Sequence, residues 1–197
     1  MGYTDTLGRV MGGSWRDATD EDKAIAVRDL VQVCSVAAGA VAIQPLPLVD
    51  IALLAPIQIG LVQGIGRIHG YDLDRKSVVE ILSTFGASLV SQHVVLAAVK
   101  LVPFAGWVLG VSMSYALTYA LGEVSDHYFK TGRGCSSREL REMFDRVYEN
   151  KKRDKQAAHT KDASLKAKLE QLKDAYAAGL MTEEEFSRKK EEVLRGF

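Results

Sequence analysis

The chain has 197 residues, of which 47% are hydrophobic and 25% are charged, and its formal net charge is zero. This length accommodates one sizeable domain and a small appendage, and the balanced charge gives no argument for a nucleic-acid-binding protein. The two cysteines, Cys34 and Cys135, lie far apart in sequence. They therefore predict no disulfide framework and favour a reducing compartment.

The charges are segregated along the chain. Residues 29–128 carry four basic and seven acidic side chains, whereas residues 129–197 carry seventeen basic and thirteen acidic ones. A long apolar block is thus followed by a densely charged tail. Such mixed charge is typical of a solvated helical surface, and the small positive excess does not predict nucleic acid as a partner.

The first predicted helix follows a polar, Gly-rich segment. Residues 1–19 predict a flexible arm. Asp20-Glu21-Asp22 then places three acidic side chains where the positive end of a helix dipole favours them, so we expect a helix to begin there. We expect this helix to run to about Ala42.

A proline turn separates the first helix from the second. Pro45 and Pro47 lack backbone donors and restrict the residues before them, so the first helix must end. Pro47 can serve as the first residue of the next helix, with Asp50 in its first turn. That helix is expected to run to about His69, with Gly70 as its C-cap.

The same arrangement is predicted a second time. Asp72 or Asp74 caps a third helix, which continues to about Leu101. Pro103 then restarts the chain as Pro47 does, and a fourth helix runs to about Tyr128. No segment shows the alternation of polar and apolar residues that marks a strand bounded by turns.

The fold class predicted is therefore all-α. Residues 20–131 form a four-helix domain of two apolar, proline-turned helical hairpins. Residues 135–160 form a charged helix and a linker, with the linker near His159-Thr160. Residues 163–197 form a small helix–turn–helix hairpin.

The C-terminal hairpin has its own helix signals. Thr182 and Glu185 are spaced as a capping box. A hairpin this short buries little surface alone, which predicts packing on a second copy or on another protein. The predicted oligomerisation residues are its regularly spaced apolar side chains, Leu169, Leu172, Tyr176, Phe186 and Leu194.

The apolar block is compatible with a membrane. Leu101–Leu121 is a run without a formal charge, and as a helix of roughly 30 Å it is long enough to cross a bilayer. The other arms are shorter, so the hairpins fit shallow or re-entrant insertion, and a soluble bundle accommodates the same helices. Basic residues lie opposite the proline turns, which predicts the cytoplasmic side of a bacterial inner membrane, with the cytoplasm as the alternative.

Small residues recur at a spacing of four in the predicted helices. Such faces let helices approach closely in lipid, and they also serve close packing in a soluble bundle. The residues concerned are Gly60, Gly64, Gly66, Gly70, Gly106 and Gly110. Asp50 and Lys100 each lie near a proline turn, where a charge in lipid is costly unless the two neutralise each other.

Nothing in the sequence predicts catalysis. The four histidines, His69, His93, His127 and His159, have no ligand-like spacing to Cys, Asp or Glu. There is also no phosphate-binding loop, nucleophile elbow or His-Glu-x-x-His motif. We therefore expect a protein that is not an enzyme, with no catalytic, cofactor-binding or metal-binding residues.

Two stretches carry a resemblance to known families. The run Ala40-Val-Ala-Ile-Gln-Pro-Leu-Pro-Leu-Val-Asp50-Ile-Ala, followed by Gln58 and Gly70-Tyr71, resembles a bacterial helical domain of unknown function over about residues 25–128. That domain is commonly appended to Era-like GTPases or found in inner-membrane proteins. The resemblance implies membrane-associated hairpins and a possible GTPase partner, but the chain has no GTPase motif of its own.

The second resemblance lies at the C-terminus. The pattern from Leu169 to Leu194, with Gly179-Leu-Met-Thr182-Glu-Glu-Glu-Phe186 at its centre, is similar to the short C-terminal oligomerisation module SHOCT. It implies self-association or docking, and a bacterial origin.

Together these features predict a non-enzymatic, membrane-associated helical protein that self-assembles or scaffolds partners through its C-terminal hairpin. One alternative is a soluble helical adaptor or cargo-type bundle that binds a protein partner. Another is a membrane-remodelling or pore-forming hairpin protein. The expected partners are membrane lipid, further copies of the chain, and a GTPase or another protein.

Overall fold

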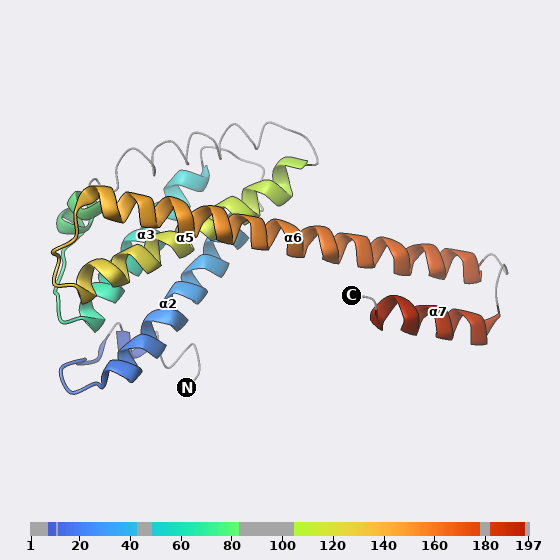
Figure 1. Ribbon diagram of the computed structural model, residues 1–197, viewed down its shortest axis with the longest axis horizontal. Coiled ribbons are helices and arrows are strands. Elements are labelled where there is room, and N and C mark those ends of the chain that lie inside the picture. The colour runs from blue at the N-terminus through green and yellow to red at the C-terminus, as the bar shows by residue number, and fades with distance from the viewer. Residues whose placement is uncertain (1–7, 11, 43–48, 83–104, 178–181, 196–197) are drawn as a thin grey trace. The chain divides into compact units, whose positions relative to one another are not determined.

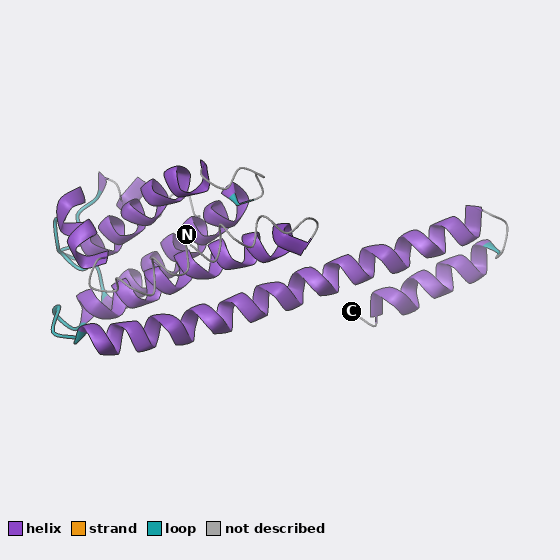
Figure 2. Cartoon of the chain, turned by 90° about the horizontal axis from the view of Figure 1, so that it is seen from above, coloured by secondary structure: helices purple, strands orange, loops and turns teal. Residues whose placement is uncertain are grey.

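The computed structural model describes residues 8–10, 12–42, 49–82, 105–177 and 182–195. Within these ranges all regular structure is α-helical and no strand occurs (Figure 2), which confirms the all-α prediction. The labelled helices are α2 (Asp20–Val41), α3 (Val49–Ile68), α5 (Ala105–Lys130), α6 (Ser137–Ala177) and α7 (Glu183–Arg195). Residues 75–82 are also helical.

Helix α2 begins where its acidic run predicts. The Asp22 N–H donates to Thr19 Oγ1 at 3.1 Å, and the Thr19 N–H donates to the Asp22 carboxylate at 3.3 Å. This reciprocal capping box satisfies donors that the first helical turn leaves without partners. The hydrogen bonds from Thr19 hold the pKa of the Asp22 carboxyl below its usual value.

Helix α3 ends in a turn that requires glycine. Gly70 has a φ of +87°, in the left-handed region. The Tyr71 N–H donates to the Gly66 carbonyl at 2.8 Å, and the Gly70 N–H donates to the Arg67 carbonyl at 3.0 Å. This pair of bonds defines a Schellman cap, so the predicted role of Gly70 as C-cap is confirmed. Pro56 lies inside α3.

Asp72 and Asp74 were the alternative caps predicted for the helix at residues 75–82, and Asp74 is the one that caps it. Asp74 Oδ1 accepts a hydrogen bond from the Ser77 N–H at 2.8 Å, and this bond lowers the pKa of the Asp74 carboxyl. Val78 and Ile81 of this helix are buried in the core.

The core forms where α2, α3 and α5 pack pairwise on one another (Figure 1). It contains Leu30 and Val31 from α2, and Leu61 and Ile65 from α3. Helix α5 contributes several fully buried apolar side chains, including Ala116, Leu117, Ala120, Leu121 and Val124. Apolar burial on this scale is the main stabilising term for such a domain.

The N-terminal segment differs from the predicted flexible arm. Val10 and Trp15 are buried members of the core, and the Arg9 guanidinium lies over the Trp15 ring at 4.5 Å. The surrounding glycines and polar residues suggested a loose segment, but one large indole buries enough apolar surface to hold it in place.

Helix α6 begins after a tight turn and belongs partly to the core. Leu140, Phe144 and Tyr148 are buried, and the Phe144 and Tyr148 rings stack with centroids 6.2 Å apart. We expected a linker near His159-Thr160, but both residues lie within α6. The charged side chains that suggested a linker are compatible with an exposed helix, and Thr160 bonds back to the Gln156 carbonyl at 2.9 Å.

The chain divides into two compact units, Met1–Arg153 and Asp154–Phe197. In the second unit the Tyr176 and Phe186 rings stack with centroids 5.0 Å apart, joining the last turn of α6 to α7. The predicted capping box is present: the Thr182 N–H donates to Glu185 Oε2 at 2.9 Å, and the Glu185 N–H donates to Thr182 Oγ1 at 3.3 Å.

Candidate functional site

An apolar groove lies between α2 and α3. It has a volume of about 300 Å³. Val33, Cys34 and Ala37 line it from α2, and Pro56, Ile57 and Gly60 line it from α3. Val36, three residues after Val33 on α2, is 53% exposed. We call this groove the α2–α3 groove; Val36 does not line it, but it extends the accessible apolar surface of α2 next to it.

The polar groups of the α2–α3 groove are few, and they lie one helical turn apart on α3. Gln63 and Arg67 line it, and no carboxylate does among the described residues. The Gln63 amide donates to the Leu73 carbonyl at 3.1 Å. Burial raises the pKa of the Cys34 thiol to about 11, so this cysteine is protonated at neutral pH and is not an activated nucleophile. The groove is suited to apolar contact rather than to acid–base chemistry.

Among the helices described, α2 is the one long and apolar enough to cross a membrane, judged by length and composition. The core helix of a soluble protein meets the same criterion, so this is weak evidence for a span. The predicted span Leu101–Leu121 begins outside the described residues.

The predicted packing glycines have different surroundings. A Cβ on Gly64 would lie 2.6 Å from Leu30 Cδ2 and 2.9 Å from Val10 Cγ1, so this glycine allows α2 to approach α3 closely. A Cβ on Gly66 would lie 2.7 Å from Leu73 Cδ1. Gly60 and Gly70 have open space around them. Neither predicted pair on α3 is therefore one continuous packing face.

Two packing glycines were missed by the sequence analysis. A Cβ on Gly122 of α5 would lie 2.5 Å from Val31 Cγ2 of α2. Gly39 of α2 faces Val111 and Tyr115 of α5 at ordinary contact distances. A small hydroxyl residue lies four positions before each of them: Thr118 before Gly122, and Ser35 before Gly39. A search for pairs of small residues, instead of pairs of glycines, would therefore have found both positions.

The remaining predicted helix-packing and turn residues are only partly described. Gly110 is buried in α5. Asp50 lies in the first turn of α3, as predicted. The side-chain surroundings of Asp50 and Gly106, and the placement of Pro45, Pro47, Lys100 and Pro103, lie outside the described residues. The proposed neutralisation of Asp50 by Lys100 stays a prediction.

Several serine and threonine side chains of helix α5 are buried in the core. Ser112, Ser114, Thr118 and Ser125 are all buried. The Gln58 amide of α3 donates to Thr118 Oγ1 at 3.5 Å, which is an interhelical hydrogen bond. The Ser125 hydroxyl donates to the Leu121 carbonyl of its own helix at 2.7 Å. Thr118 is therefore part of the packing between α3 and α5, whereas the Ser112 and Ser114 hydroxyls have no hydrogen-bond partner among the described residues.

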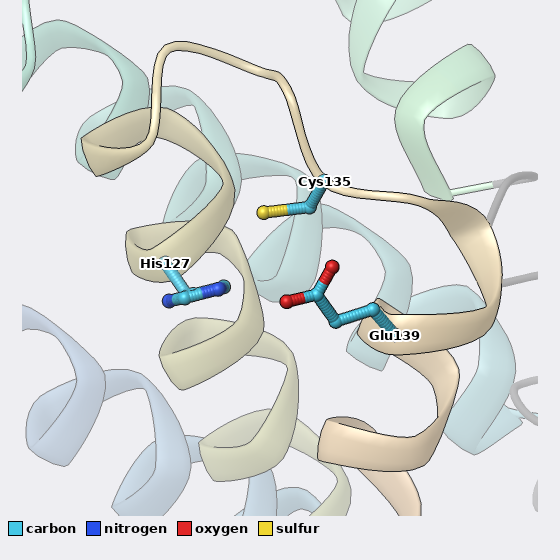
Figure 3. A group of neighbouring side chains, drawn as sticks. All are labelled: His127, Cys135 and Glu139. Carbon is cyan, nitrogen blue, oxygen red and sulfur yellow. The ribbon is translucent and has the colours of Figure 1, made fainter.

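Two groups of titratable side chains come together near the ends of α3 and α5. His69 Nε2 lies 2.6 Å from Asp126 Oδ1, which joins the end of α3 to α5. A second group consists of His127, Cys135 and Glu139, whose ligand-type atoms all lie within 4.8 Å of one another (Figure 3). The sequence analysis predicted no metal ligands, because the spacing of these three residues matches no familiar motif.

The predicted oligomerisation residues lie in the C-terminal unit. Tyr176 is 41% exposed and Leu194 is 48% exposed, while Leu169, Leu172 and Phe186 are half-buried. No residue of α7 is buried. The hairpin therefore leaves most of its apolar stripe accessible within its own unit.

Comparison with known proteins supports two family assignments. Residues 13–153 match the family model described as Domain of unknown function (DUF697), and residues 167–194 match the Short C-terminal domain, SHOCT. The chain is 25% identical over 116 residues to "Magnetosome membrane protein 22" of Magnetospirillum gryphiswaldense. That stretch covers 55% of this chain and 60% of the relative. No solved structure matches the chain.

Proposed function

Because the chain belongs to the family described as Domain of unknown function (DUF697), with a SHOCT segment at residues 167–194, we propose that it is a non-enzymatic, membrane-associated protein. In this proposal the helical domain contacts lipid and the C-terminal hairpin self-assembles or scaffolds a partner. Neither matched family is an enzyme family, and the curated relative is named as a membrane protein.

The accessible apolar face of α2 is the observation that carries the membrane part. No charged residue occurs on α2 after Asp29, and the exposed Val36 lies on this helix between Val33 and Ala37, which line the α2–α3 groove. Water-accessible apolar patches of this kind mark interaction sites. Burying one valine in lipid is worth about 1.5 kcal/mol or more, so a few such side chains give measurable binding.

The distribution of basic residues supports an orientation on the cytoplasmic face of the bacterial inner membrane. The ends of α3 and α5 meet where the Tyr71 and Phe129 rings lie 5.3 Å apart. Arg67 and Lys130 occupy the last turns of these two helices. Cations at one end of an apolar domain are attracted to anionic headgroups and remain on the cytoplasmic side.

The C-terminal hairpin supports the self-assembly part. Its only ring contact among the described residues is the Tyr176–Phe186 stack, and no side chain of α7 is buried. A second copy of the chain, or a partner such as a GTPase, would cover the exposed part of this stripe.

Flotation tests the membrane part. The full chain is mixed with vesicles of phosphatidylethanolamine and phosphatidylglycerol and centrifuged through a density gradient, with and without a high-salt or alkaline wash. We expect the protein to float with the vesicles after both washes, because apolar contact is not screened by salt. Recovery in the soluble fraction would contradict membrane association.

Light scattering tests the self-assembly part. The full chain is compared with a chain that lacks residues 163–197, at the same protein concentration. We expect the shortened chain to have a smaller mass per particle. An unchanged mass would show that the hairpin does not drive assembly.

A soluble helical adaptor is the second candidate, and the burial of α5 favours it. Most of the described residues of this helix are buried, as in the central helix of a water-soluble bundle. A chain that does not float but binds a purified protein partner would support this candidate over the first.

A further inference from the structure

We propose that His127, Cys135 and Glu139 form a zinc-binding site that ties the end of α5 to the start of α6. Figure 3 shows the three side chains converging, with the Cys135 sulfur and the Glu139 carboxylate directed toward the His127 ring. Their ligand-type atoms all lie within 4.8 Å of one another. His127 and Cys135 are half-buried, and Glu139 is exposed.

The turn between the two helices creates this juxtaposition. Gly132 and Arg133 have φ values of +66° and +67°, in the left-handed region. The Gly132 N–H donates to the Phe129 carbonyl at 3.1 Å and the Arg133 N–H donates to the Tyr128 carbonyl at 2.9 Å, so the turn is a Schellman cap. The reversal places the last turn of α5, which bears His127, against the first turn of α6, which bears Glu139.

Glu139 departs from the role that its position predicts. Ser136 and Glu139 have capping-box spacing, and the Glu139 N–H does donate to Ser136 Oγ at 3.2 Å. In the capping boxes of Thr19 and Thr182 the acidic side chain accepts the returning hydrogen bond from the cap N–H. Among the described residues the Glu139 carboxylate makes no such bond, and it lies instead beside His127 and Cys135.

A neighbouring hydroxyl holds the sulfur in position. Thr131 Oγ1 lies 2.9 Å from Cys135 Sγ and 2.8 Å from the His127 carbonyl oxygen. When Cys135 loses its proton to bind a metal, the Thr131 hydroxyl can turn to donate to the thiolate. Such outer hydrogen bonds orient ligands and raise metal affinity. Thr131 is therefore a positioning residue.

The donor set selects the class of ion. One thiolate, one imidazole nitrogen and one carboxylate oxygen are ligands that zinc accepts in tetrahedral sites, with bonds of about 2.0 to 2.3 Å. Ligand atoms in such a tetrahedron lie about 3.3 to 3.8 Å apart. The three side chains, whose ligand-type atoms lie within 4.8 Å of one another, would therefore move closer together when the ion binds, and the exposed Glu139 side chain can do so by rotation. The thiolate and carboxylate together balance the charge of the divalent ion, and water takes the fourth position.

Cobalt(II) is the probe, because it occupies zinc sites and gives a thiolate-to-metal charge-transfer band. Untagged, reduced full-length protein is titrated with Co²⁺, and Zn²⁺ is then added to displace it. We expect one Co²⁺ per chain, with the band present, and displacement by one equivalent of Zn²⁺. A folded wild-type chain that shows no such band would overturn the proposal.

The chain provides a matched control, because it has two cysteines. Cys135→Ser should abolish the band, whereas Cys34→Ser should retain it with unchanged affinity. Glu139→Gln should weaken binding more than about 100-fold, and Thr131→Val by about 10- to 100-fold, as outer-shell changes do. Circular dichroism checks that each variant is folded. Equal Co²⁺ affinity and an equal band in Cys135→Ser and Cys34→Ser would also overturn the site.

Discussion

Gly122 of α5 lies so close to Val31 of α2 that a side chain at position 122 would collide with the valine. A Cβ built on Gly122 would lie 2.5 Å from Val31 Cγ2 and 3.0 Å from Val31 Cγ1. Val31 is itself buried, and its branched side chain has little rotameric freedom in a helix. This contact sets how closely α2 and α5 approach.

We expect Gly122→Ala to lower the free energy of unfolding by about 1 kcal/mol. Overpacking costs roughly 1–3 kcal/mol, and the better helix propensity of alanine returns about 1 kcal/mol. The change in the free energy of unfolding is measured by thermal unfolding followed by tryptophan fluorescence, since Trp15 is in the core. Gly60→Ala is the control, because Gly60 has open space around it. It should raise stability by about 0.5–1 kcal/mol. Equal shifts in the two variants would contradict the contact.

We expect Val36→Asp to reduce vesicle binding at least about tenfold. This change places a charge on the apolar face beside the α2–α3 groove and removes one valine from contact with lipid, which together cost more than about 1.4 kcal/mol. Flotation at a series of lipid concentrations gives the partition coefficient.

Val79→Asp is the matched control for this change. Val79 is 51% exposed, almost the same as Val36 at 53%, but it lies on the helix at residues 75–82 and not on α2, whose apolar face is the proposed contact surface. We expect Val79→Asp to leave vesicle binding within about twofold of the unmodified chain, a change below about 0.5 kcal/mol. Equal losses in both variants would show that the apolar face of α2 is not the contact surface.

We expect Phe186→Ala to weaken self-association of the chain by about 1–2 kcal/mol. The change removes the ring that stacks on Tyr176 and deletes apolar surface from the accessible stripe. Sedimentation equilibrium over a range of concentrations gives the association constant. Arg188→Ala, an exposed change two residues later on α7, should leave that constant unchanged. The proposal fails if Arg188→Ala has the larger effect.

We expect the start of α7 to loosen at acid pH. Hydrogen bonds from the Thr182 backbone N–H and hydroxyl lower the pKa of the Glu185 carboxyl. Since the folded value is the lower one, this stabilisation is complete above the ordinary glutamate value of about 4.3 and is lost as the pH falls through the lowered value. Amide exchange of residues 183–186 in the full chain should therefore accelerate in that range.

The Glu185 titration itself can be followed by NMR of the carboxyl carbon. Thr182→Ala keeps the backbone N–H but removes the hydroxyl, so the midpoint should move part of the way back toward the ordinary value. A midpoint that is the same in both proteins would rule out a contribution from the hydroxyl.

Local sequence signals predicted most of the helix ends. The acidic run in the first turn of α2, Gly70 after α3 and the Thr182–Glu185 pair each act within one or two turns of the chain. The burial of Trp15 was not predictable in this way, because it depends on contacts with residues far away in sequence. The continuity of α6 through His159 was also missed, since charged residues are as common in exposed helices as in linkers.

The candidate sites were predicted less completely than the fold. Gly64 and Gly66 have close neighbours, as their spacing suggested, but Gly122 has the tightest contact and no glycine partner four residues away. The cluster of His127, Cys135 and Glu139 depends on two consecutive left-handed residues, one of them the non-glycine Arg133. No sequence rule for metal spacing anticipates such a turn.

The burial of Leu140, Phe144 and Tyr148 determines where this protein can be cut. A fragment that stopped before α6 would lack three buried side chains and expose the surfaces they cover, so it would be prone to aggregation. The family match and the first compact unit both extend to residue 153. A fragment ending there keeps the whole aromatic pair, so we expect it to accept a different tail in place of residues 154–197.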